Sequence, residues 1–175
     1  MKNSLFLILF LFTVHKVEAQ NFRKFDISNS GCQAYFFCVP DTFDKAYSPD
    51  SSVVYTSDCT TGDETYGVIC VKLKTTIDKP DDAVDVLIEY LDFLKKEVNI
   101  VSAAGYGKGH TMRNYDKARG VIDYWVDKGK TEWKIKGWTD GKYMGILYSY
   151  TSKESTSGYE SKRDLFLESF RFPGM

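Results

Sequence analysis

The sequence predicts a single α+β domain in which helices pack on a central antiparallel sheet. Three observations support this class. Short runs of β-branched and aromatic residues are separated by turn residues, an apolar helical stripe occupies residues 81–99, and a second helical pattern occupies residues 159–170. The expected order is three strands, a helix, about four strands and a helix (βββ-α-ββββ-α), which is a layered arrangement.

Length and composition fit one domain. The chain has 175 residues, of which 43% are hydrophobic, 15% aromatic and 27% charged. A chain of this length can bury one ordinary core but not two comfortable ones. The formal net charge is -1, which provides no general attraction to nucleic acid or to anionic lipid. We therefore expect no nucleic-acid partner.

The first nineteen residues are typical of a cleavable secretory signal peptide. Lys2 precedes a short apolar run at residues 5–14, and the sequence Val-Glu-Ala follows at residues 17–19. The run is shorter than the roughly 20 residues that a membrane-spanning helix needs. We predict cleavage after Ala19, which leaves one mature domain at residues 20–175. That domain would be secreted or periplasmic and not integral to a membrane, the alternative being a retained N-terminal anchor.

The first half of the expected domain contains four cysteines: Cys32, Cys38, Cys59 and Cys70. Export permits disulfides, and four cysteines allow three complete pairings. If the strands at 34–39 and 52–57 pair antiparallel with Cys38 opposite Val53, Cys32 falls opposite Cys59 at bonding distance. This assumed register predicts a Cys32–Cys59 disulfide and leaves Cys38 and Cys70 as buried free thiols. The cysteine and histidine spacing matches no zinc pattern.

Residues 81–99 are predicted to form a long, buried helix. Pro80 stands in its first turn, and Asp81 and Asp82 lie at its positive end. The apolar positions recur at helical spacing and form one stripe: Val84, Leu87, Ile88, Leu91, Leu94 and Val98. We interpret the stripe as core rather than as a surface for a partner. Residues 100–112 then predict a strand with a glycine-rich edge or bulge.

Two hairpin turns are predicted at residues 127–130 and 139–142. If Lys128-Gly129 and Asp140-Gly141 are the turn centres, two apolar rows form one sheet face: Ile122–Ile135–Ile146 and Tyr124–Trp133–Tyr148. The opposite face is then mixed and charged, with Asp123 opposite Lys134.

The mixed face is the candidate binding surface of the protein. It comprises Trp125, Lys134, Lys136, Trp138 and Tyr143. Exposed aromatic rings beside charged groups are a common composition of protein-contact surfaces. The alternative is that the second helix covers this face and makes its rings ordinary core.

The strand at residues 34–40 (AYFFCVP) and the closing segment at residues 165–172 (LFLESFRF), in this order of elements, resemble the PsbP-like family. That family includes a photosystem II extrinsic subunit, a Ran-binding nuclear transport factor and exported bacterial proteins. The resemblance covers nearly the whole mature chain and implies a central antiparallel sheet covered by helices. It also implies a non-enzymatic accessory or binding role, and it supplies no site residues.

The sequence predicts no catalytic, cofactor-binding or metal-binding residues. The expected mature chain has one histidine, His110, and no G-x-S-x-G motif. Of the function classes considered, the sequence therefore favours a hydrolase least. We expect an exported accessory module that contacts a protein partner through the mixed face. The alternative is a carrier of a small apolar ligand, with a pocket between the sheet and the 81–99 helix.

Overall fold

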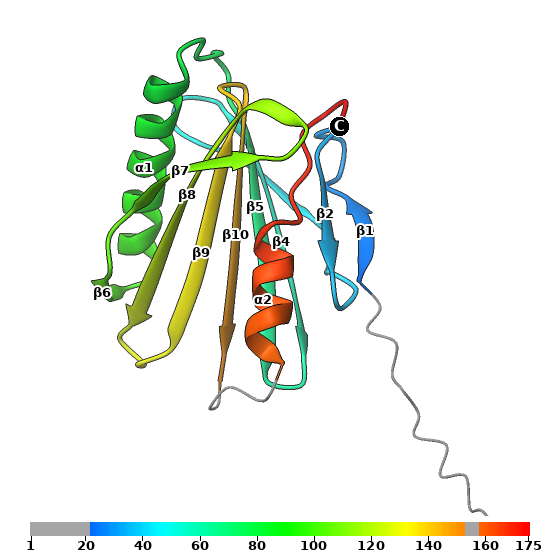
Figure 1. Cartoon of the computed structure of the whole chain (residues 1–175), viewed down its shortest axis with the longest axis vertical. Coiled ribbons are helices and arrows are strands. Elements are labelled where there is room, and N and C mark those ends of the chain that lie inside the picture. The colour runs from blue at the N-terminus through cyan, green and yellow to red at the C-terminus, as the bar shows by residue number, and fades with distance from the viewer. Residues whose placement is uncertain (1–21, 153–157) are drawn as a thin grey trace, which may run out of the picture.

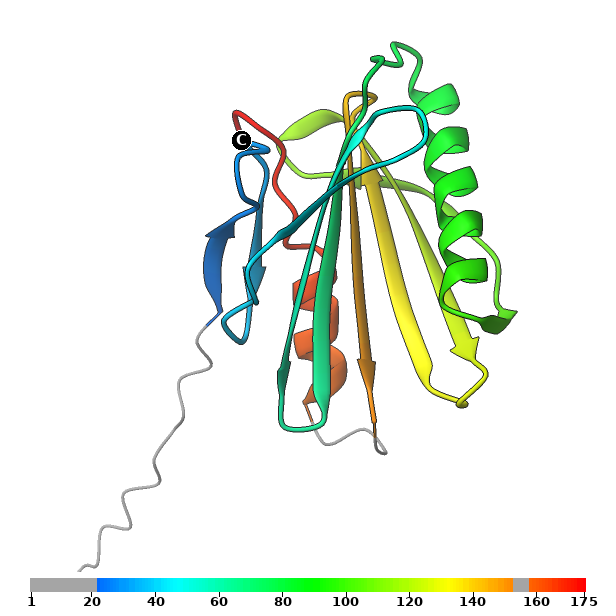
Figure 2. The ribbon, with the colours of Figure 1, turned by 180° about the vertical axis from the view of Figure 1, so that it is seen from behind.

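The computed structural model describes residues 22–152 and 158–175, in which two helices flank a large antiparallel sheet (Figures 1 and 2). The elements of the first half are β1 (Arg23–Asp26), β2 (Gln33–Phe36), β3 (Asp44–Tyr47), β4 (Val53–Thr61), β5 (Glu64–Lys72) and α1 (Pro80–Glu97). Those of the second half are β6 (Ile100–Ala103), β7 (Gly107–Met112), β8 (Tyr115–Asp127), β9 (Glu132–Thr139), β10 (Tyr143–Thr151) and α2 (Tyr159–Leu167).

The strand order in the main sheet is β3-β4-β5-β10-β9-β8-β6, and β7 also pairs with β8. The hairpin of β1 and β2 forms a separate small sheet. The predicted α+β class and its order of strands, helix, strands, helix are confirmed. In the described residues five strands precede α1 and five follow it, where three and about four were predicted. The additional strands of the first block are the short strands β1 and β3, whose side chains are mostly exposed. These strands lack the apolar alternation that marks a half-buried strand.

Two apolar clusters lie on opposite faces of the main sheet. The first packs against α1 and includes Leu87, Ile135 and Ile146. The second lies beneath α2, the hairpin of β1 and β2 and the closing segment of the chain, and it includes Trp138 and Phe166. Figures 1 and 2 show α1 and α2 against different parts of the sheet.

The long helix α1 has the ends that its sequence predicts. Pro80 opens it, acidic residues occupy its first turn, and Lys95 and Lys96 occupy its last. Leu87 and Leu91 of the predicted stripe are completely buried, whereas Val98, its last member, is 38% exposed. The helix therefore buries a narrower stripe than expected, because it packs on one face of the sheet, against β6, β8 and β9. The glycine-rich segment after it forms β6 and β7, both paired irregularly with β8, so the predicted edge or bulge is confirmed.

The predicted register between β8 and β9 is wrong by one residue. The backbone N–H of Asp127 donates to the carbonyl oxygen of Thr131 at 3.2 Å, so the loop between these two residues has three residues rather than two. Asp123 consequently pairs with Ile135 instead of Lys134. A slip of one residue turns every side chain of a strand to the other face. Tyr124 therefore leaves the predicted apolar row and is 47% exposed.

The register between β9 and β10 differs from the predicted one by two residues. Gly141 (φ 82) takes the first central position of the turn between Asp140 and Tyr143. A hairpin turn whose first central residue is left-handed and whose second is not corresponds to type II′, which favours glycine at the first central position. Because side chains alternate with a period of two, this slip preserves the faces of β9 and β10. Trp133, Ile135 and Ile146 therefore share a face, as predicted.

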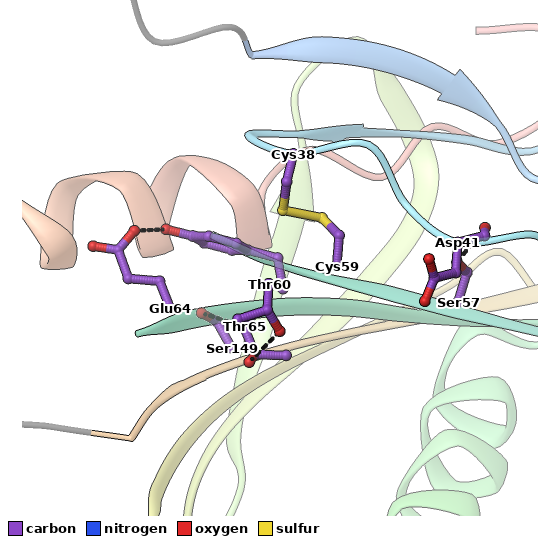
Figure 3. Close-up of a disulfide and its surroundings, with 9 residues drawn as sticks. Cys38, Asp41, Ser57, Cys59, Thr60, Glu64, Thr65 and Ser149 are labelled. Carbon is purple, nitrogen blue, oxygen red and sulfur yellow. Dashed lines mark hydrogen bonds between the residues drawn. A yellow bond between two sulfur atoms is a disulfide. The ribbon is translucent and has the colours of Figure 1, made fainter. Parts of the chain in front are cut away.

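The predicted Cys32–Cys59 disulfide is also wrong. The structure contains a Cys38–Cys59 disulfide with a Cα–Cα distance of 5.9 Å, and Cys32 and Cys70 are buried free thiols. Figure 3 shows Cys38, on the loop that follows β2, meeting Cys59 on β4. The prediction failed because β2 pairs with β1 and not with β4, so the assumed register does not exist.

Candidate functional site

The structure places four of the five predicted binding residues on one sheet face, but that face is covered. Lys134, Lys136 and Trp138 lie on β9 and Tyr143 begins β10, and all four side chains are buried. Trp138 has 0% exposure. The expectation that these groups form an open surface is therefore corrected.

Hydrogen bonds to α2 and to Glu168, the residue that follows it, explain why these side chains are buried. The Lys134 ammonium donates to the Asp164 carboxylate, and the Lys136 ammonium donates to Glu168. The indole N–H of Trp138 donates to the carbonyl oxygen of Leu167 at 3.2 Å. The lysines that the sequence assigns to a partner surface thus bind the protein's own carboxylates. This face is an internal interface between β9 and α2.

Trp125 lies on the opposite face of the sheet, under α1. Its indole N–H donates to Asp123 Oδ2 at 2.7 Å, and the Lys95 ammonium lies 2.9 Å from the same oxygen. The Asp123 side chain has 0% exposure. Its other oxygen accepts hydrogen bonds from the backbone N–H groups of Tyr124 and Gly105. This buried carboxylate therefore joins α1, β8 and the loop before β7.

Lys95 is held by more than one partner. Its ammonium lies 4.1 Å from the centre of the Tyr106 ring, and the Tyr106 hydroxyl donates to Asp92 at 2.7 Å. Burial alone would lower the pKa of Lys95, but its contacts with Tyr106 and Asp123 outweigh burial and raise that pKa. Burial raises the pKa of Tyr106 to about 12. Lys95 therefore remains charged and paired at neutral pH.

A pocket of about 110 Å³ lies beside this network, beneath the last turns of α1. Its walls come from α1, the residue after it and four strands: Ile69, Leu94, Val98, Trp125, Trp133, Ile135, Ile146 and Tyr148. Val98 is 38% exposed, so this wall reaches the solvent at the C-terminal end of the helix. This is the region in which the carrier hypothesis expects a pocket.

The polar atoms of the two indoles in the pocket wall are already bonded. Trp125 donates to Asp123, and the indole N–H of Trp133 donates to Asp127 Oδ2 at 2.9 Å. Asp127 also accepts a backbone hydrogen bond from Thr131 at 2.9 Å within the hairpin loop. These bonds orient both rings and leave their carbon surfaces toward the pocket. The wall thus offers apolar contact and no unsatisfied indole donor.

Tyr148 closes the pocket on the β10 side and depends on a glycine. Its ring lies 5.6 Å from that of Trp133, centre to centre. Gly67 pairs directly with Tyr148, and a Cβ at position 67 would overlap the Tyr148 ring. Burial raises the pKa of Tyr148. Because glycine has no side chain at position 67, the Tyr148 ring can occupy its place in the pocket wall.

A second, larger concavity of about 470 Å³ lies near the end of the chain, where no sequence pattern indicates a site. Its lining residues are Met112, Arg113, Asn114, Glu168, Arg171 and Met175. Arg171 donates to the carbonyl oxygens of Glu168 and Phe170 at 2.9 and 2.7 Å. Most of its polar side chains are exposed, so water competes for them.

His110 lies on β7 beside Lys136. Its Nδ1 lies 3.5 Å from the Lys136 ammonium. Burial and then the charge of Lys136 lower the pKa of His110. In residues 22–152 and 158–175, no group of three or more His, Cys, Asp or Glu residues could hold a metal ion.

A disulfide is compatible with an extracellular or periplasmic location, and none of the helices in the described ranges has the length and apolarity to span a membrane. The predicted signal peptide at residues 1–19 lies outside the described residues.

No protein-family model matches the chain, and no curated protein matches it either.

Proposed function

We propose that this chain is an exported, non-enzymatic protein that binds a small apolar ligand between α1 and the central sheet. The observation that carries this proposal is the apolar pocket beneath Leu94 and Val98. Small-molecule sites are concave and lined mainly by hydrophobic and aromatic side chains. The Cys38–Cys59 disulfide and the order of elements support the export and the PsbP-like resemblance that belong to the same proposal.

The size of the pocket defines the ligand class. A volume of about 110 Å³ is somewhat below the roughly 150 Å³ of an engineered apolar cavity that binds benzene. We therefore expect one aromatic ring or a short alkyl group to enter, with larger parts of the ligand lying outside past Val98. An uncharged group is favoured, because moving a charge into an apolar site without a partner is costly. The Lys95 ammonium, which lies 5.6 Å from the centre of the Trp125 ring in the pocket wall, is already paired with Asp123.

The other hypothesis is contact with a protein partner through Trp125, Lys134, Lys136, Trp138 and Tyr143. Such a contact would require α2 to leave the sheet and the bonds from Lys134 and Lys136 to break. Trp125 would still face the other way. We therefore prefer the ligand carrier.

Benzene is the probe that tests the carrier proposal. Methyl NMR shifts of Ile69, Ile135 and Ile146 would be followed during a titration, because these side chains line the pocket. We expect saturable shifts at these methyl groups. No saturable shift at any of the three would contradict the proposal.

A matched pair of variants locates the binding. Val98→Phe places a ring at the pocket rim, and Val101→Phe adds the same ring on β6 at a 65% exposed residue outside the pocket wall. Val98→Phe should weaken benzene binding by about tenfold or more, the scale of steric discrimination in apolar pockets. Val101→Phe should bind as the unaltered protein does, and equal affinities of the two variants would count against this site.

A further inference from the structure

The two free cysteines lie in one apolar cluster. Cys32 precedes β2 and Cys70 lies on β5 of the main sheet, and both have 0% exposure in the core beneath α2. The two residues thus come from the small hairpin and from the main sheet. A bond between them would join these two sheets.

The hairpin is positioned over β4 and β5 by contacts at both of its ends. Near Cys32, the Tyr55 hydroxyl donates to Asn29 Oδ1 at 2.6 Å. Tyr55 pairs directly with Cys70, so their side chains project from the same face of the sheet. At the other end, Cys38 is bonded to Cys59 on β4 (Figure 3). The Tyr55–Asn29 contact therefore brings the turn that contains Cys32 to the face from which Cys70 projects.

The side chain of Cys70 interacts with that of Cys32. A hydrogen bond with Cys32, together with burial, raises the pKa of the Cys70 thiol. The Ser30 hydroxyl accepts the backbone N–H of Cys32 at 3.0 Å, which fixes the turn that presents this thiol.

We propose that Cys32 and Cys70 form a second disulfide in the oxidised protein, so that the hairpin is attached covalently to the main sheet near both ends of β2. With Cys38–Cys59 it is one of the three complete pairings that four cysteines allow. The proposal is independent of the ligand pocket, which lies on the other face of the sheet.

The oxidant is a small-molecule or protein disulfide, of which oxidised glutathione is the simplest. The S–H bonds of Cys32 and Cys70 break and one S–S bond forms between them. The S–S bond of the oxidant breaks, and its two sulfur atoms take up the two electrons and the two protons. Because both cysteines are completely buried, the exchange occurs before the core closes around the hairpin.

The test is disulfide mapping of the full chain after refolding in a mixture of reduced and oxidised glutathione. Free thiols are blocked with N-ethylmaleimide in denaturant at acidic pH, and the unreduced protein is then digested. Trypsin is unsuitable, because no Lys or Arg separates Cys32 from Cys38 or Cys59 from Cys70. Chymotrypsin cuts after Tyr35 and Tyr66 and places the four cysteines in separate peptides.

We expect one cross-linked peptide pair that joins Cys32 to Cys70, beside the Cys38–Cys59 pair, and no maleimide on any cysteine. Maleimide on both Cys32 and Cys70, or a bond from Cys32 to Cys38 or Cys59, would overturn the proposal. In the matched variant Cys70→Ser, Cys32 should become the single cysteine that carries maleimide or glutathione, while Cys38–Cys59 persists. A Cys70→Ser protein in which Cys32 is bonded to Cys38 or Cys59 would also overturn it, because Cys32 would then have another partner within the chain.

Discussion

The Lys95 ammonium and the Asp123 carboxylate lie 2.9 Å apart, and the Asp123 side chain is completely buried. This pair connects the last turn of α1 to the middle of β8. The same carboxylate accepts the indole N–H of Trp125, which lines the apolar pocket. A structural ion pair therefore positions both the helix and one ring of the candidate site.

The first prediction concerns this pair. Lys95→Met leaves the buried Asp123 carboxylate without its ammonium, and removal of one partner of a buried pair costs about 3–5 kcal/mol. Because Lys95 is itself partly exposed, we expect a loss near the lower end of that range in urea unfolding. The control Lys96→Met, at an exposed position in the same turn, should change stability by less than about 0.5 kcal/mol. Similar losses in both variants would contradict the role of the pair.

The second prediction concerns pH. Burial tends to raise the pKa of Asp127, but the hydrogen bonds from Trp133 and Thr131 outweigh it and lower that pKa below 3.8. A carboxyl with a lowered folded-state pKa adds stability above its unfolded pKa, and this stability is lost as the pH falls through the folded value. The bond to Trp133 should therefore weaken only below pH 3.8. NMR titration of Asp127 in Trp133→Phe should show its pKa moving upward, and an unchanged pKa would refute this cause.

The third prediction concerns Gly67. A Cβ in Gly67→Ala would overlap the Tyr148 ring, and overpacking of this kind costs about 1–3 kcal/mol. Displacement of the ring should also weaken benzene binding, since Tyr148 lines the pocket. In the double variant with Tyr148→Ala, the added cost of Gly67→Ala should largely vanish in a double-mutant cycle. Additive costs would show that the two positions do not interact.

The fourth prediction distinguishes a buried face from a binding surface. Trp138→Ala removes a completely buried ring and should destabilise the protein by about 3–5 kcal/mol in urea unfolding. Tyr47→Ala removes a ring that is 66% exposed on the edge strand β3 and should cost less than about 0.5 kcal/mol. If Trp138→Ala leaves the unfolding midpoint unchanged, α2 does not cover this face in solution.

Local patterns predicted the type of most elements. Proline at position 80, the acidic first turn and the apolar stripe predict α1 because capping and periodicity act within one segment. Both hairpins were also predicted, but their registers were not. Asp127 bonds to Thr131 across one loop, and Gly141 rather than Asp140 begins the other turn. Turn residues mark where a chain reverses, whereas the pairing depends on which residue adopts the left-handed conformation.

The candidate site was harder to predict than the fold. In the sequence, Leu94, Trp133 and Ile146 are indistinguishable from ordinary core residues. Hydrophobicity does not reveal where neighbouring side chains leave a pocket between them. The sequence predicts that Lys134 and Lys136 are surface residues, since lysine is almost never buried unless it is paired. Their carboxylate partners lie thirty or more positions away in the sequence, and no local pattern identifies them.

The sequence by itself determined an α+β domain of strands and two helices, because helical and strand periodicity are properties of neighbouring residues. Only the tertiary structure decided which cysteines bond and which sheet face each side chain occupies. A shift of one residue in register reverses a face, and the approach of the β1–β2 hairpin to β4 selects Cys38 over Cys32. These outcomes depend on contacts between distant segments, whose partners no single segment specifies.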